Sequence, residues 1–241
     1  IALIILFLMA FVSCALIMNA HADIVRYYVT PNGSDNNDGS SWSSATTLAG
    51  VISKIGNSDW NSDGYEIWLQ SGDYTNGNAI TISSSSRSGP TDVTIIGGFK
   101  GTETSSADRP AGGMSKLTGN GSGRLITVKD GSGKDNNSYA INLTLSNLVI
   151  SGGITSGDNS IENPNCGGGL YVGPYNTATI KNCAFVNNTA SRDSYGDGGH
   201  GGAVYCSTSS VLTVENSTFK SNTAIAESDK VTSDASDPHA G

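Results

Sequence analysis

The sequence predicts an all-β protein, a single-domain right-handed parallel β-helix, and three observations lead to this fold. A repeat with a period of 34 residues runs through the C-terminal part, so that Tyr171 returns as Tyr205 and Phe185 as Phe219. A fixed period of this length is typical of a solenoid. Apolar and polar residues alternate within each repeat, which is the period of a strand. The 31 glycines among 241 residues supply the positive backbone angles of tight coil corners.

The strand pattern is clearest in three related phrases, at residues 143–150, 178–185 and 212–219. Two or three short strands per repeat fit one coil of a β-helix better than a helix pair, a leucine-rich repeat or a propeller blade. Successive coils then stack ~4.8 Å apart. We therefore expect Ile150, Phe185 and Phe219 to form one inward-pointing stack.

Asparagine recurs inside the same phrases, as Asn182 and Asn216, with an earlier copy at Asn147. These residues lie between two strand halves, where we expect a bend. Two interpretations stay open. The side-chain amides of Asn182 and Asn216 could bond each other in a ladder, as in stacked sheets, or the residues could simply serve ordinary turn chemistry.

The first 22 residues are expected to be a secretory signal. Residues 1–18 are almost wholly apolar, and Ala20 and Ala22 match the small-x-small cleavage pattern. The chain begins with Ile1 and has no charged leader, so we expect the signal to be truncated at its start. A transmembrane anchor is the alternative, since 18 apolar residues could span a bilayer. Cleavage would leave Asp23 as the first residue of an exported protein.

Residues 23–140 are less repetitive and are expected to form an N-terminal cap and the first coils of the same domain. Alternating patterns predict strands at 24–30, 65–70, 79–83, 92–99 and 124–129. Residues 141–241 carry the repeats. The pattern is lost from Asp229 onward, so we expect the sequence to be a piece of a longer chain at both ends.

A short helix is expected between the first two strands. Ser44 would cap it, and it would run to Ile55, with Leu48, Ile52 and Ile55 on one face. The first coil of a β-helix has an open edge that would otherwise recruit other strands. The predicted helix would cover that edge.

The charge balance limits the partners. A net charge of −8 argues against nucleic acid, which requires a basic face, and gives no sign of attraction to anionic membranes. We expect no cofactor and no metal. The expected partners are host or surface glycans or proteins, and membrane association is expected only through a domain outside this sequence.

Three cysteines remain after the predicted cleavage, at positions 166, 183 and 206, an uneven number for an exported protein. Cys183 lies at an inward position of its repeat and is expected to act as a small buried apolar residue. A disulfide between Cys166 and Cys206, which flank the glycine-rich strands, stays open. Isolated cysteines with no second ligand nearby do not favour zinc.

Several phrases resemble known secreted proteins. The stretches at residues 27–35, 38–42 and 97–103 are similar to the N-terminal module of secreted bacterial right-handed parallel β-helix proteins. The recurring phrases Gly-Gly-x-x-Tyr and Phe-x-x-Asn resemble the repeats of chlamydial polymorphic outer membrane proteins and similar adhesin-like surface proteins. The resemblance spans nearly all of the chain after the predicted signal. It implies a β-helix passenger exposed on the cell surface, implicated in adhesion and followed by a translocator or sorting domain.

Catalysis requires a base and positioned carboxylates, and the best candidates are Arg192, Asp193, Asp197 and His200 in the loop 191–202. This loop is an insertion between repeat phrases, where charge normally serves solvation. The stretch from Asp35 to Gly39 suggests calcium, but its spacing does not match the twelve-residue loop, and a polar turn is favoured. We assign no catalytic, cofactor or metal residue.

The sequence therefore predicts an exported, non-catalytic β-helix with an adhesive or structural role. Its predicted location is the outer membrane, the cell surface or the medium. The alternative is a polysaccharide lyase or glycosidase whose catalytic coils lie beyond Gly241.

Overall fold

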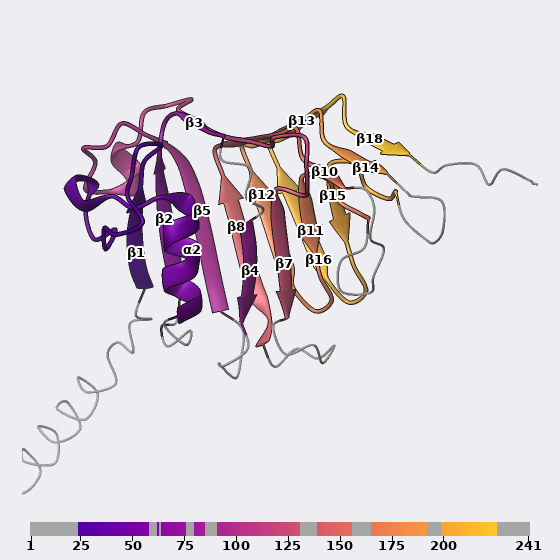
Figure 1. The fold of residues 1–241 in the computed structure, drawn as a ribbon, viewed down its shortest axis with the longest axis horizontal. Helices are drawn as coiled ribbons and strands as arrows, with labels where there is room; N and C mark the ends of the chain where they lie inside the picture. Colours follow the sequence, from indigo (N-terminus) through magenta and orange to yellow (C-terminus); the bar gives the residue numbers. More distant parts are fainter. Residues whose placement is uncertain are drawn as a thin grey trace, which may run out of the picture.

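The computed structural model describes residues 24–57, 62, 64–75, 80–84, 91–130, 139–155, 165–191 and 199–225. Every pairing between its named strands is parallel. Strands that lie side by side come from successive turns of the chain, which winds along the long axis of the molecule (Figure 1). The predicted all-β parallel β-helix is therefore confirmed.

The described residues form four sheets that run along the axis. The longest has six strands: β1 (Ile24–Val29), β2 (Gly64–Gln70), β5 (Thr91–Phe99), β8 (Ile141–Ser146), β12 (Thr177–Lys181) and β16 (Val211–Glu215). We call it sheet A. The next, sheet B, has five: β3 (Asp73–Tyr74), β6 (Ser115–Thr118), β9 (Leu148–Ser151), β13 (Ala184–Val186) and β17 (Thr218–Lys220).

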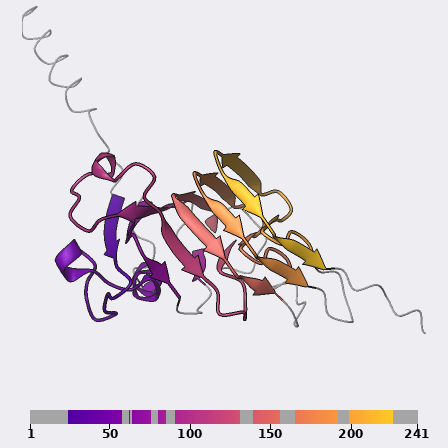
Figure 2. The same cartoon turned by 90° about the horizontal axis from the view of Figure 1, so that it is seen from above.

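The other two sheets close the coil. Sheet C has four strands: β4 (Ile80–Ser84), β7 (Ile126–Asp130), β11 (Leu170–Val172) and β15 (Val204–Cys206). Sheet D has three: β10 (Ile154–Thr155), β14 (Thr189–Ser191) and β18 (Thr223–Ile225). The coil that begins at β12 thus contains four strands, β12 to β15, where two or three were predicted. The turned view shows these short strands side by side along the axis (Figure 2).

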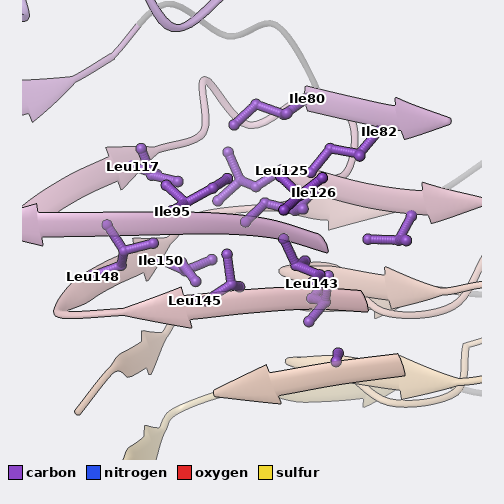
Figure 3. Packing of buried hydrophobic residues seen from close by; sticks show 14 of the residues in the cluster. Ile80, Ile82, Ile95, Leu117, Leu125, Ile126, Leu143, Leu145, Leu148 and Ile150 are labelled. Atoms are coloured by element: carbon purple, nitrogen blue, oxygen red, sulfur yellow. The ribbon is translucent and has the colours of Figure 1, made fainter. Parts of the chain in front are cut away.

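The predicted inward stack is confirmed. Phe185 pairs in register with Ile150 of the preceding coil and Phe219 of the following coil. Ile150 and Phe185 are fully buried. Branched aliphatic side chains from sheets A, B and C fill the interior around them (Figure 3), among them Ile82, Ile95, Leu117, Ile126, Leu143 and Leu145. Burial of these apolar side chains is the main force that holds the coils together.

The capping helix is present but begins later than predicted. The helix α2 spans Leu48–Asn57, after a short 3-10 turn η1 at Trp42–Ser44. Thr46 between them bridges to Val29, so the backbone is extended where the helix was expected. The side chain of Thr47, and not of Ser44, caps α2 by accepting from Gly50 N–H at 2.9 Å.

The buried face of α2 covers the first coil, as predicted. Val51 and Ile55 are buried in the core, and Leu48 and Ile52 pack against it. The helix contacts β1 and β4 and so lies beside the first strand of sheet C (Figure 1). Within the described residues, no helix is long and apolar enough to cross a membrane.

The glycine pairs of the repeat allow sheet D to approach the coil closely. A Cβ atom at Gly168 would lie 2.4 Å from the carbonyl oxygen of Thr189, and one at Gly202 would lie 2.3 Å from that of Thr223. Side chains larger than hydrogen cannot fit at such distances. The Gly-Gly phrase and the Asn-Thr-Ala phrase therefore recur with the same period because they pack against each other.

Candidate functional site

A column of left-handed asparagines marks the outer bend between sheets A and B. Asn147, Asn182 and Asn216 have φ angles of 57°, 52° and 47°. Asparagine tolerates this conformation better than most residues. The backbone N–H of Asn147 donates to the carbonyl of Lys181 at 3.1 Å, and that of Asn182 donates to the carbonyl of Glu215 at 3.1 Å. The predicted bend is confirmed.

The amide ladder lies one bend further on, so its predicted position was wrong. The side chain of Asn188 donates to Oδ1 of Asn222 at 2.9 Å and to the carbonyl of Ile150 at 2.9 Å. Its own Oδ1 accepts from Gly153 N–H at 3.0 Å. Asn188 is fully buried, and this ladder satisfies backbone groups inside the coil.

The amides of Asn182 and Asn216 are left for other partners. Both residues are exposed. Within the described part of the chain, no hydrogen bond involves either side-chain amide. Each amide carries two donors and one acceptor oxygen. Successive coils place these groups at the coil spacing, ~4.8 Å.

These asparagines form the floor of a groove of about 450 Å³. Ala184 and Thr218, on the outer face of sheet B, extend the floor to one side. The wall at the N-terminal side is made by Arg109, Gly112 and Met114. The groove therefore combines exposed amides with an apolar side chain and one cation.

The wall belongs to an excursion at residues 100–114, which replaces the asparagine bend in the coil of β5 and β6. Gly97 lies against the carbonyl of Asn147, where a Cβ would approach to 2.4 Å. The excursion contains a second 3-10 turn, η2 (Ser106–Asp108), capped by Ser105. Ser115 then begins sheet B, and its N–H donates to the carbonyl of Asn147 at 3.2 Å.

A buried carboxylate holds the base of the excursion. Glu103 accepts from the backbone N–H groups of Lys100 at 2.7 Å, Gly101 at 2.9 Å and Thr102 at 3.0 Å. Burial by itself would raise the pKa of Glu103, but the backbone donors together outweigh it, so the pKa lies below the usual glutamate value. Glu103 is therefore ionised at neutral pH.

An aromatic cluster outside sheet A anchors the same segment. Trp68 and Phe99 stack with ring centroids 4.4 Å apart, and Trp42 lies 5.7 Å from Phe99. The indole N–H of Trp42 donates to the carbonyl of Glu103 at 3.0 Å. Arg26 covers the ring of Trp68 at 4.1 Å. The excursion is thus fixed to the first coils by packing and by hydrogen bonds.

The loop considered for catalysis is described only in part. Arg192, Asp193 and Asp197 lie outside the described residues. His200 is exposed, and its backbone bridges to Cys166 of the preceding coil, as the repeat alignment implies. Among the described residues, no group of three or more His, Cys, Asp or Glu side chains could hold a metal ion.

The acidic stretch near residue 35 forms polar turns. Asp35 accepts from the hydroxyl of Thr47, and Asp38 accepts from the N–H and the hydroxyl of Ser40, each at 2.9 Å. The hydrogen bonds from Ser40 lower the pKa of the Asp38 carboxyl. These contacts satisfy the two carboxylates within their own loop.

The three cysteines that the structure describes, Cys166, Cys183 and Cys206, are free. Cys183 is buried as predicted, and burial raises the pKa of its thiol to about 11. Cys206 pairs with Val172, whereas Cys166 pairs with His200, so the open question of a Cys166–Cys206 disulfide is answered by two free thiols.

A buried arginine that the repeats did not reveal lies outside sheet C. The guanidinium of Arg124 lies 4.7 Å from the ring of Tyr171 and donates to the carbonyl of Cys166 at 2.7 Å. Tyr171 in turn stacks on Tyr205 at 5.9 Å. Burial lowers the pKa of Arg124 to about 10, so it stays protonated at neutral pH. Arg124 fixes the backbone that precedes β11.

No protein-family model matches the chain. No curated protein matches it either. Among solved structures, the crystal structure of pectate lyase Pel9A is similar over 69% of this chain and 40% of that chain, with 17% sequence identity and a TM-score of 0.34. The match thus spans less than half of that protein's length. These comparisons do not test the resemblance to the chlamydial repeats.

Proposed function

We propose that this chain is the β-helix passenger of an exported surface protein and that it binds glycans, in an adhesive and non-catalytic role, along the groove at the asparagine bend. The observation that carries the proposal is the pair of exposed amides of Asn182 and Asn216, unused by the fold and aligned in a groove of about 450 Å³. Display at the outer membrane or cell surface is part of the same proposal.

The chemistry of the groove suits a linear sugar polymer that lies along the helix axis. Amides offer donors and acceptors to sugar hydroxyls, and the coil spacing of ~4.8 Å is close to the length of one pyranose unit. Met114 and Ala184 offer apolar contacts to the C–H faces of the sugar rings. Each coil then contributes one weak and similar contact.

A binding role is favoured over catalysis by the groups that line the groove. The described residues that line the groove include Arg109 and Cys183 but no carboxylate, and the side chain of Cys183 is buried. A thiol whose pKa is raised to about 11 stays protonated at neutral pH and is a poor nucleophile. Glycoside hydrolysis commonly needs two carboxyl groups.

The test is binding of a panel of neutral and acidic oligosaccharides to the 241-residue chain, compared with an Asn182→Gly, Asn216→Gly double variant. Glycine keeps the left-handed backbone, so only the amides are removed. We expect affinity to fall about tenfold or more, since each hydrogen bond contributes about 0.5–1.5 kcal/mol.

Asn187→Gly is the matched control. Asn187 is also exposed and left-handed, with φ 55°, but it does not line the groove. Equal loss of affinity in the control and the double variant, or no binding to any glycan, would refute the proposal. The same incubations are assayed for unsaturated or reducing products, whose release would favour the enzymatic alternative.

A further inference from the structure

The wall of the groove carries an arginine that is only partly used by the fold. One nitrogen of the Arg109 guanidinium, Nη1, donates to the carbonyl of Gly113 at 3.1 Å and so supports the excursion. Within the described part of the chain, its Nε and Nη2 groups have no hydrogen-bond partner, and no carboxylate pairs with it. Nε and Nη2 form one edge of the guanidinium fork, which matches the two oxygens of a carboxylate.

The groove carries a local positive charge on a chain that is negatively charged as a whole. Among the described residues that line the groove, Arg109 is the one ionised side chain. Lys181, next to the floor, is paired with Glu215 at 3.4 Å. The chain as a whole carries a net charge of −8, which opposes the approach of a densely charged polyanion. The site therefore suits a ligand whose negative charges are few and widely spaced.

We propose that the groove selects glycans that carry isolated carboxylates, with one carboxylate bound by the Nε–Nη2 edge of Arg109 and the neighbouring neutral sugars bound by Asn182 and Asn216. This inference rests on the proposed function and specifies its ligand class. The bidentate contact is charge-assisted, so it adds selectivity to the weak amide contacts.

The experiment uses hyaluronan oligosaccharides, which carry a carboxylate on every second sugar, and the same oligosaccharides with their carboxyl groups reduced to alcohols. Affinities of the 241-residue chain for both probes are measured by calorimetry. We expect the acidic probe to bind about tenfold tighter than the reduced probe. Arg109→Gln should abolish this difference by weakening the binding of the acidic probe.

Two further variants separate the contact from general charge and from folding. Lys100→Gln removes a positive charge from the same excursion, at an exposed residue outside the groove lining, and should preserve the preference. Arg109→Lys keeps the charge but not the fork, and should retain only part of the preference. Thermal melting of each variant verifies that the excursion stays folded.

The outcomes distinguish the two proposals. Equal affinity for both probes, or a preference that persists in Arg109→Gln, would overturn the carboxylate inference while glycan binding stands. Loss of affinity for both probes in Arg109→Gln would mean that Arg109 acts only through its bond to Gly113, and would also overturn it. Binding of neither probe, nor of any other glycan in the panel, would refute the proposed function itself.

Discussion

Phe185 and Phe219 stack with ring centroids 5.2 Å apart and planes only 9° from parallel, yet one is fully buried and the other is 44% exposed. The two residues occupy equivalent positions of successive coils. Their difference in burial arises because Phe185 has a coil on both sides, whereas the described chain places a coil on only one side of Phe219.

The two phenylalanines should therefore differ in their contribution to stability. Phe185→Ala leaves a core cavity and should lower the free energy of unfolding by about 3–5 kcal/mol. Phe219→Ala removes a half-exposed ring and should cost clearly less. Urea denaturation of both variants measures the difference. Equal losses of unfolding free energy would contradict the difference in burial between Phe185 and Phe219.

The asparagine ladder predicts a second contrast. Asn188→Ala would leave the N–H of Gly153 and the carbonyl of Ile150 without their buried partner. At about 1–3 kcal/mol for each of these two unsatisfied groups, a total loss of about 2–6 kcal/mol is expected. Asn187→Gly, next to it but exposed, should cost less than about 1 kcal/mol because glycine adopts the same backbone conformation. Similar losses in the two variants would argue against the ladder.

The glycine pairs should not tolerate a methyl group. Gly168→Ala places a Cβ 2.4 Å from the carbonyl of Thr189 and 2.7 Å from that of Gly202, so sheet D must move away from the coil. We expect a marked fall in melting temperature. Gly56→Ala, in helix α2 with no atom within 4 Å of the added Cβ, should raise stability by about 0.5–1 kcal/mol. A melting temperature unchanged by Gly168→Ala would refute the close approach.

Acid should release the excursion at residues 100–114. The pKa of Glu103 is lower in the folded chain than in the unfolded chain, so its stabilisation is complete above the ordinary glutamate pKa of ~4.3 and is lost as the pH falls toward the folded value. Trp42 fluorescence follows the change, because its indole N–H donates to the backbone carbonyl of Glu103 within the same segment. Glu103→Gln should be less stable at neutral pH and lose this part of the acid dependence. If Trp42 fluorescence changed with pH in the same way in the parent chain and in Glu103→Gln, Glu103 would not be responsible for the acid dependence.

The repeats predicted the inner stack because the phenylalanine period and the core position coincide. They did not reveal which of Asn187 and Asn188 turns inward. Both positions are asparagine, and the choice depends on the hydrogen bond that the side chain donates to the carbonyl of Ile150. The short strands β3 and β6 escaped prediction because two or four residues give too little alternation.

The groove was beyond a repeat-based prediction for a different reason. Its floor is periodic, and the sequence indicated Asn182 and Asn216 at a bend. Its wall comes from Arg109 and Met114 in a segment that occurs once, and only the fold brings that segment beside the bend. Arg124 was missed likewise, since its partners Cys166 and Tyr171 lie more than 40 residues away.

The equal spacing of Tyr171 and Tyr205, of Asn182 and Asn216, and of Phe185 and Phe219 makes the coil an exchangeable unit of length. Deletion of residues 172–205 would join two chain segments at equivalent positions of successive coils. The residues that stack from coil to coil would therefore stay in register. A duplication of the same 34 residues would add one amide to the groove in the same way. Under the proposed glycan-binding function, the length of the bound polymer is therefore set in whole coils, and recombination within the gene can change it while the contacts of each coil stay the same.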